Sequence, residues 1–296
     1  MSGRRVSVVI GSFNRKPFLR LAVESVRPEM VRLAGEIIVV DGGSNDGTLA
    51  WLAEQRDVIT IVQHNHGTWR GRHVERRSWG YFMNLGFKVA QGKYVCMLSD
   101  DCLVVQGAIW NGVAQADGLV AEGRKLGAVA FYWRNWPEQK SYWVGRTFGG
   151  KLFVNHGLYV REALKAVDYA DEDTYDFYHA DGDLCLRMWQ SGYECVAASD
   201  SFVEHYAGAN RAVRQSNLAK QKRDWERYTA RWAHLDLDRG SGAVGDWVLR
   251  DYVDAYGTAG RFNSISEVRV ANIRARWRRG AEVLRRMARR AAGSAP

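Results

Sequence analysis

The sequence lacks the features that mark membrane-spanning, secreted and disulfide-rich proteins. It contains no run of about 18 uncharged apolar residues, so we expect no transmembrane helix. The apolar stretch at residues 6–10 is too short for a signal-peptide core, and no small-residue cleavage site follows it. The four cysteines include no Cys-x-x-Cys pair, which argues against a disulfide framework or zinc ribbon and favours a reducing cytoplasm.

The net positive charge of the chain is concentrated at its end. The formal net charge is +9, and the ten arginines and two glutamates after residue 260 account for +8 of it. Residues 1–260 therefore carry only +1. A nucleic-acid-binding domain should have its own basic face, so we expect no nucleic-acid partner. The remaining composition is globular, and 296 residues suit one large α/β domain or two modest ones.

Buried strands and helices alternate along the first third of the chain, which is typical of a parallel sheet flanked by helices. The predicted strands span residues 6–10, 36–40, 58–62 and 94–98. The first predicted helix begins at Pro17, and two more span residues 49–54 and 79–90. Later in the chain, predicted helices span residues 184–189 and 216–232. Ligands bind beyond the carboxyl ends of parallel strands, so we expect the polar segments 12–14, 41–46 and 99–101 to share one cleft.

Two adjacent carboxylates follow the strand at residues 94–98. Asp100 and Asp101 would repel each other at the sheet edge unless a cation or hydrogen-bond donors compensate them. A hard divalent metal ion held against a substrate phosphate is one such compensator. The alternative is an ordinary turn in which an aspartate caps the backbone.

A glycine-rich segment, Asp41-Gly-Gly-Ser-Asn-Asp-Gly-Thr48, follows the second predicted strand. Its glycines allow close backbone approach, and Asp41 and Ser44 offer acceptors for a base or sugar edge. The amides at the start of the next helix suit an anion. The segment is neither a P-loop nor a Gly-x-Gly-x-x-Gly motif. The alternative is a plain strand-to-helix turn with Asp46 as the N-cap.

Three further side chains could carry chemistry in the second half of the chain. Asp181 or Asp183, near the start of a predicted helix, could act as a general base that accepts a hydroxyl proton. Their alternative roles are helix capping for Asp181 and a solvated first-turn acid for Asp183. His205 follows a short apolar strand, where a structural hydrogen bond is the alternative; near Asp101 it would complete an open octahedral site for Mg²⁺ or Mn²⁺.

These segments form an ordered set over roughly residues 4–232. The set comprises VSVVIGSFNR (6–15), IIVVDGGSNDGT (37–48), MNLGFKVAQGKYV (83–95), LSDD (98–101), the stretch 181–193 and His205. It resembles the family 2 inverting glycosyltransferases of the GT-A fold. The resemblance implies an α/β fold with a Rossmann-like, mostly parallel sheet flanked by helices, here followed by a C-terminal helical extension.

According to the resemblance, one group of side chains contacts a nucleotide-sugar and another holds a metal ion. Asp100 should face the ribose or the donor sugar. Asp101 matches the last aspartate of the DxD-type motif and, with His205, should hold Mn²⁺ or Mg²⁺ against the diphosphate. Arg211 and Arg214 could add donors to the diphosphate from a mobile loop, and their alternative is a solvated helix face. The full set expected to contact the nucleotide-sugar is Ser12, Asn14, Asp41, Ser44, Asp100, Asp101, Arg211 and Arg214.

The sequence departs from the family pattern at several positions. Gly42 stands where many members have a second aspartate, which leaves the choice among uridine, thymidine and guanosine open. Ala180 replaces the glutamate that usually precedes the family's catalytic base, here Asp181, so Asp183 stays a second candidate for that role. The first acid of the DxD motif is missing. Residues 225–228 do not match the Gln-x-x-Arg-Trp motif of processive synthases.

The residues and the resemblance together predict a metal-dependent, non-processive inverting glycosyltransferase. It would move one sugar from a UDP-, dTDP- or GDP-linked donor to a cell-envelope glycan or a lipid-linked acceptor. The incomplete DxD motif leaves a second hypothesis, a non-catalytic nucleotide- or glycan-binding relative. Residues 1–105 would bind the nucleotide-sugar, 106–235 would bind the acceptor and carry the base, and 236–296 would form the helical, Arg-rich extension.

The C-terminal extension has a pattern of its own. Over residues 271–290, apolar side chains recur near helical spacing and arginines fill most other positions. A basic amphipathic helix with a tryptophan on its apolar side is typical of binding to an anionic membrane surface. It would place a cytoplasmic enzyme on the inner face of the plasma membrane. The alternatives are a helix packed on the body, a dimer contact or a solubilising tail.

Overall fold

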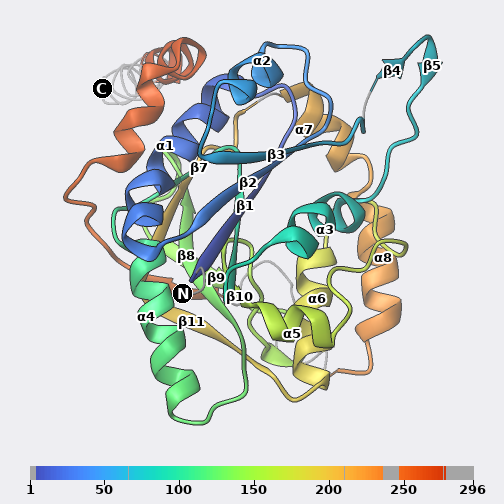
Figure 1. Ribbon diagram of the computed structural model, residues 1–296, viewed down its shortest axis with the longest axis vertical. Coiled ribbons are helices and arrows are strands. Elements are labelled where there is room, and N and C mark those ends of the chain that lie inside the picture. Colours follow the sequence, from blue (N-terminus) through green and yellow to red (C-terminus); the bar gives the residue numbers. More distant parts are fainter. Residues whose placement is uncertain (1–4, 66, 210, 236–246, 276, 278–296) are drawn as a thin grey trace, which may run out of the picture. The chain divides into compact units, whose positions relative to one another are not determined.

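A computed structural model of the protein describes residues 5–65, 67–209, 211–235, 247–275 and 277. The chain forms two compact units, residues 1–259 and residues 260–296. The first unit is an α/β structure built on one large sheet (Figure 1). In the second unit, residues 266–275 are helical. Among the described residues, no helix has both the length and the apolar character needed to cross a bilayer.

The N-terminal part of the sheet is parallel, as the sequence predicts. Its strands are Val6–Ser12 (β1), Glu36–Asp41 (β2), Val58–Val62 (β3) and Tyr94–Ser99 (β6). β1 lies between β2 and β6, and β2 also pairs with β3. All of β2, and all but one residue in each of β1 and β6, are buried, which explains their continuous apolar runs.

The rest of the sheet is mostly antiparallel. Its strands are Cys102–Val104 (β7), Leu126–Asn135 (β8), Tyr142–Gly145 (β9), Gly157–Val160 (β10), Glu194–His205 (β11) and Trp247–Arg250 (β12). β10 joins β6 to β8, and β11 runs parallel to β8 and antiparallel to β7. β12 pairs with β9, so part of the range expected to form a helical extension is a strand of the sheet. A separate hairpin comprises Thr68–Trp69 (β4) and Arg72–His73 (β5).

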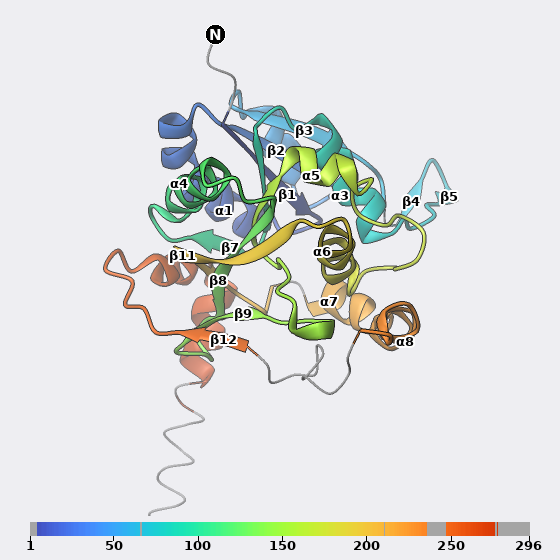
Figure 2. The same cartoon turned by 90° about the horizontal axis from the view of Figure 1, so that it is seen from below.

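Helices cover both faces of the sheet, which confirms the predicted fold class. They are Lys16–Leu33 (α1), Thr48–Ala53 (α2), Trp79–Val89 (α3), Ala108–Ala121 (α4), Arg161–Ala166 (α5), Ala180–Gln190 (α6), Arg211–Leu218 (α7) and Gln221–Trp232 (α8). α1 and α4 pack on one face, and α3, α5 and α6 pack on the other (Figure 2). Alternate residues of β1 enter the two apolar clusters, Val8 and Ile10 one of them and Val9 the other.

The prediction of one helix over residues 216–232 is wrong. α7 and α8 are separate helices with residues 219–220 between them. They bury different side chains: Asn217 of α7 lines the cavity described below, whereas Tyr228 and Trp232 of α8 enter an aromatic cluster. Both segments are polar and helical in pattern, so the periodicity of the sequence does not show the break between them.

Candidate active site

A cavity of about 590 Å³ opens at the carboxyl ends of β1 and β6, where the parallel strands predict a ligand site. The predicted site residues that line it are Ser12, Asp100, Asp101, Asp181, His205 and Arg214. Those that lie elsewhere are Asn14, Asp41, Ser44 and Asp183. The side chain of Arg211 lies outside the described part of the chain.

One arginine bridges the two adjacent carboxylates. Arg15, at the start of α1, donates from Nη1 to Asp100 Oδ1 at 2.8 Å and to Asp101 Oδ2 at 2.9 Å. Ser12 Oγ donates to the other Asp100 oxygen at 2.9 Å. The compensation that two neighbouring acids need thus comes partly from the protein itself. Our sequence reasoning assigned no role to Arg15, although a basic residue three positions after Ser12 was the available signal.

The two acids differ in their proton affinity because their surroundings differ. Burial raises the pKa of Asp100 to about 6, against the opposing pull of Arg15. Burial acts on Asp101 in the same direction, but His205 and Arg15 outweigh it and hold the pKa of this carboxyl below its usual range. Asp101 is therefore a carboxylate throughout the physiological range.

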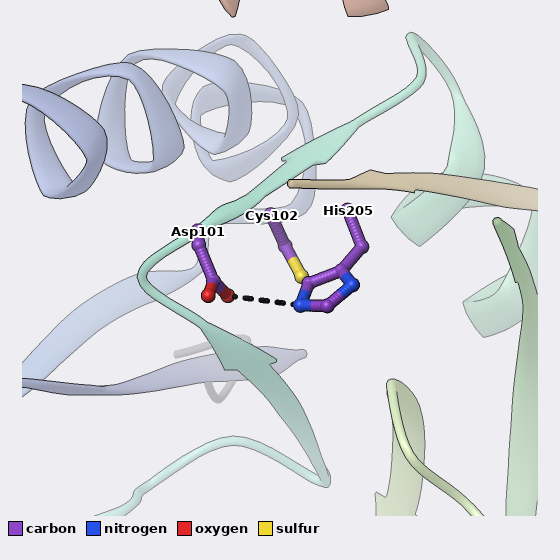
Figure 3. Close-up of side chains that lie close together, drawn as sticks. All are labelled: Asp101, Cys102 and His205. Carbon is purple, nitrogen blue, oxygen red and sulfur yellow. Dashed lines mark ion pairs between the residues drawn. The ribbon is translucent and has the colours of Figure 1, made fainter. Parts of the chain in front are cut away.

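Asp101 and His205 face each other across the cavity floor. His205 Nε2 lies 3.4 Å from Asp101 Oδ1, and Figure 3 shows the two side chains pointing together. His205 Nδ1 lies 2.6 Å from Asn135 Oδ1, and this contact orients the ring so that Nε2 faces Asp101. The β7–β11 pairing creates this arrangement, because it places the end of β11 beside the turn between β6 and β7 that carries Asp101.

These donors fit a divalent metal ion. Asp101 Oδ1 is buried and makes no hydrogen bond within the described residues, so one carboxylate lone pair is available. A carboxylate oxygen and an imidazole nitrogen both suit Mn²⁺ or Mg²⁺. Neighbouring ligands of an octahedral ion bound at about 2.1 Å lie about 3 Å apart. The 3.4 Å spacing between Asp101 Oδ1 and His205 Nε2 is close to that value.

A second histidine, His156, also lines the cavity. It was not identified from the sequence as a site residue. His156 is 5% exposed, and burial together with the nearby His205 lowers its pKa to about 3. The Trp133 ring stands nearly perpendicular to the imidazoles of both His156 and His205, at 88° and 86°. His156 follows no recognisable motif, so only the packing of β8 against β10 reveals its place.

Asp181 presents a carboxylate to the cavity from the first turn of α6. Gly182 N donates to Oδ1 at 2.9 Å, and Asn155 Nδ2 donates to Oδ2 at 3.0 Å. Burial raises the pKa of Asp181 to about 6. Above that pH the group is ionised and can accept a proton from a hydroxyl in the cavity.

The segment before Asp181 is held firmly. The buried carboxylate of Asp224 in α8 accepts the backbone amides of residues 176, 177 and 178, each at 2.9 Å. His179 then adopts the left-handed conformation, with φ of 67°, and its ring stacks on Tyr228. Such a conformation is costly for a non-glycine residue and persists only where the surroundings enforce it. The network thereby fixes the start of α6 and the direction of Asp181.

Asp183 points the other way, into the core. It is fully buried, and Arg187 Nε donates to its Oδ2 at 2.8 Å. Trp232 Nε1 and the Tyr175 hydroxyl donate to its Oδ1 at 2.9 and 3.1 Å. Arg231 lies within 3.2 Å of the same oxygen. This carboxylate is saturated by structural donors and does not reach the cavity.

Asn14, Asp41 and Ser44 hold two loops together. Asp41 accepts the amides of Gly43 and Ser44 through Oδ1 and the Ser44 hydroxyl through Oδ2. Ser44 Oγ in turn accepts the Asn14 amide at 2.8 Å. Gly42 lines the cavity instead, and a Cβ there would lie 3.1 Å from the Phe13 ring. A second aspartate at this position would crowd Phe13.

Arginines form one rim of the cavity. Arg214 of α7 lines it and donates to the carbonyl of Ala207. Arg76 and Arg77, which follow the β4–β5 hairpin, also line it and were not singled out from the sequence. Arg76 is partly buried and donates to Asn217 Oδ1, and burial lowers its pKa. The rim therefore carries positive charge that suits an anionic ligand.

Comparison with known proteins settles the family. Residues 7–158, slightly more than half of the chain, match the model of glycosyl transferase family 2. The chain belongs to this family. Its sequence-based assignment to family 2, and with it the general class of glycosyltransferase, is confirmed.

Solved structures of other proteins share the fold. S. aureus TarS (residues 1–349) superposes with a TM-score of 0.52 at 14% identity, over 76% of this chain and 72% of TarS. The mannosyltransferase PcManGT from Pyrobaculum calidifontis, solved with GDP-Man and Mn²⁺, gives 0.51 at 19% identity, over 77% of this chain and 65% of PcManGT. Protein CgeD of Bacillus subtilis (strain 168) is 27% identical over 99 residues, which are 33% of this chain and only 23% of CgeD.

Proposed function

We propose that this family 2 glycosyltransferase is metal-dependent, inverting and non-processive, and that it transfers one sugar from a nucleotide-diphospho-sugar to a hydroxyl acceptor. The observation that carries the proposal is the convergence of Asp101, His205 and Asp181 on one cavity. These residues lie far apart in the sequence, and no structural need of the fold explains a carboxylate–imidazole pair beside a second, separate carboxylate.

The donor class is supported by the relatives. TarS has been solved with UDP and with UDP-GlcNAc, and PcManGT with GDP-Man and Mn²⁺. In this chain, the nucleotide would lie beside Ser12 and Asp100 at the ends of β1 and β6. Asn14, Asp41 and Ser44 would shape the pocket through the loops that they hold together, rather than by direct contact.

Asp101 and His205 would hold Mn²⁺ or Mg²⁺. When bound, the ion acts as a Lewis acid that offsets the negative charge developing on the leaving diphosphate. Arg214, on the rim of the cavity, would donate hydrogen bonds to the leaving diphosphate. We infer the same role for Arg211. Arg15 keeps Asp100 and Asp101 in place and limits their mutual repulsion.

Asp181 would act as the general base. Its carboxylate accepts the proton of the acceptor hydroxyl as that oxygen attacks the anomeric carbon. Asn155 fixes the carboxylate by its hydrogen bond to Oδ2. A single displacement of this kind inverts the anomeric centre. Asp183 is disfavoured for this role because its oxygens are occupied by core donors.

The acceptor and the cellular location remain part of the proposal. We infer a cell-envelope glycan or lipid-linked acceptor, with the basic segment 271–290 binding an anionic leaflet from the cytoplasmic side. Residues 271–275 of this segment are helical, and the Trp277 side chain is 77% exposed. The other residues of this segment lie outside the described part of the chain.

Nucleotide binding tests the proposal directly. In a thermal-unfolding panel of UDP, GDP, dTDP and CMP with Mn²⁺, we expect one of the three diphosphates to stabilise the protein. At 100 times its Kd, a ligand specific for the folded state adds about 2.7 kcal/mol. Asp101→Ala should remove the Mn²⁺-dependent part of this stabilisation. If no nucleotide shifts the unfolding temperature, or if Asp101→Ala leaves the shift intact, the proposal fails.

The pH dependence of turnover tests the base. Because burial raises the pKa of Asp181 to about 6, the carboxyl becomes protonated below that pH and can no longer accept a proton. We expect kcat at saturating donor to be level above pH 7 and to fall about tenfold per pH unit below pH 6. The residual rate of Asp181→Asn should lack this dependence. A wild-type profile that stays level down to pH 5 would contradict the assignment.

A further inference from the structure

A third potential metal ligand lies beside Asp101 and His205. In the antiparallel pairing of β7 with β11, Cys102 stands directly opposite His205. Side chains of directly paired residues project from the same face of a sheet, with their Cβ atoms about 5 Å apart. The Cys102 sulfur, the His205 imidazole and the Asp101 carboxylate each place a ligand atom within 4.8 Å of the other two (Figure 3).

The surroundings of these three side chains favour a shared ion. The buried Asp101 Oδ1 lacks a hydrogen bond within the described residues, although it lies 3.4 Å from His205 Nε2. The His205 ring is turned by Asn135 so that Nε2 faces inward. Cys102 is 1% exposed, and its sulfur lies 3.5 Å from His156 Nε2 as well as beside these two donors.

Arg15 limits which oxygens remain available. Its guanidinium binds Asp101 Oδ2 and Asp100 Oδ1, and Ser12 binds Asp100 Oδ2. Of the four carboxylate oxygens on the two adjacent acids, Asp101 Oδ1 is the one to which no described residue donates a hydrogen bond. The protein therefore offers an ion one oxygen, one nitrogen and one sulfur.

We propose that Cys102 is a third protein ligand of the metal ion and that it makes the site prefer thiophilic divalent ions over Mg²⁺. This inference rests on the proposed function for the use of the ion in donor binding. Mg²⁺ demands oxygen ligands and near-ideal octahedral geometry, whereas thiolate and imidazole suit Co²⁺ and Zn²⁺. The affinity of the site therefore rises from Mg²⁺ through Mn²⁺ to Co²⁺ and Zn²⁺. On coordination the Cys102 S–H bond is replaced by a sulfur–metal bond, and the proton is released to the buffer.

Cobalt absorption gives a readout that does not depend on activity. The metal-free full-length chain is titrated with Co²⁺ alone, and the thiolate-to-cobalt charge-transfer band in the near ultraviolet is recorded. We expect the wild type to develop the band and Cys102→Ser to lack it. Cys96→Ser is the matched control, because Cys96 is also buried but lies within β6 and is not part of the group formed by Asp101, Cys102 and His205. This variant should keep the band.

Competition between metal ions tests whether the site has the expected metal preference. Zn²⁺ should displace Co²⁺ from the wild type, and Mg²⁺ should not do so at the same concentration. His205→Ala should also weaken Co²⁺ binding, which covers the case in which Cys102→Ser folds poorly. The inference is overturned if Co²⁺ binds without the band, if Cys102→Ser retains the band, or if Co²⁺ does not bind at all.

Measuring nucleotide binding alongside the cobalt band tests the ligand assignment and the proposed function separately. If Cys102→Ser loses the cobalt band but the favoured nucleotide with Mn²⁺ still stabilises it, both proposals stand and Cys102 sets metal preference. If the wild type shows the cobalt band but binds no nucleotide, the ligand assignment stands and the proposed function fails. Nucleotide binding without any cobalt band overturns the ligand assignment alone.

Discussion

Asp181→Asn is expected to lower kcat for sugar transfer about 10²- to 10⁴-fold while leaving nucleotide binding intact. The variant removes the proton acceptor but keeps the size of the side chain. Its oxygen can still accept from Gly182 N, and the Asn155 amide can turn its own oxygen toward the new NH₂ group. The loss should therefore appear in kcat at saturating donor rather than in the Kd for nucleotide. Full activity in this variant would exclude Asp181 as the base.

The same variant should be more stable than the wild type at pH 7.5. A half-buried carboxyl whose pKa is raised to about 6 favours folding when protonated, and this contribution is lost as the pH rises through 6. At pH 7.5 the folded wild type therefore carries an ionised group that burial disfavours. Asparagine removes this charge and should add about 2 kcal/mol to the free energy of unfolding. Urea unfolding at pH 7.5 and at pH 4.5 checks the sign, because the difference should become smaller as the pH falls below 6.

Asp183→Asn is expected to have the opposite signature, with a loss of about 3–5 kcal/mol in the free energy of unfolding. The reason is the buried network around Asp183, in which the carboxylate neutralises Arg187 and also accepts from Trp232 and Tyr175. Without that charge, Arg187 stays largely buried and unpaired with any acid in this network. Urea unfolding at pH 7.5 measures the loss.

Transfer activity then tells the two acids apart. At a temperature where Asp183→Asn is folded, its kcat should stay within a few-fold of the wild-type value. Asp181→Asn is the matched comparison, since it changes the same atoms two residues away on the same helix. A folded Asp183→Asn that binds nucleotide but has lost transfer would move the base role from Asp181 to Asp183.

Sequence-based predictions were accurate where local residue patterns determine the structure and failed where contacts between distant segments determine it. The strands of the parallel part were visible because burial on both faces demands continuous apolar runs, as in residues 6–10 and 36–40. The single helix over 216–232 was a wrong prediction because the break depends on which core each half contacts. The residues that received a site role from motifs alone had different outcomes. Asp100 and Asp101 line the cavity, whereas Asp41 accepts hydrogen bonds from its own turn and does not line the cavity.

The sequence by itself determined the alternation of strands and helices, the family and the edge of the sheet where polar residues gather, because these depend on local patterns of burial and turn formation. Only the tertiary structure decided which polar atoms are free to react. It directed Asp181 into the cavity and Asp183 into the core, paired Arg15 with two acids 85 and 86 residues away, and set Cys102 opposite His205. Such outcomes depend on which partners saturate each donor and acceptor, and those partners come from distant segments that only folding brings together.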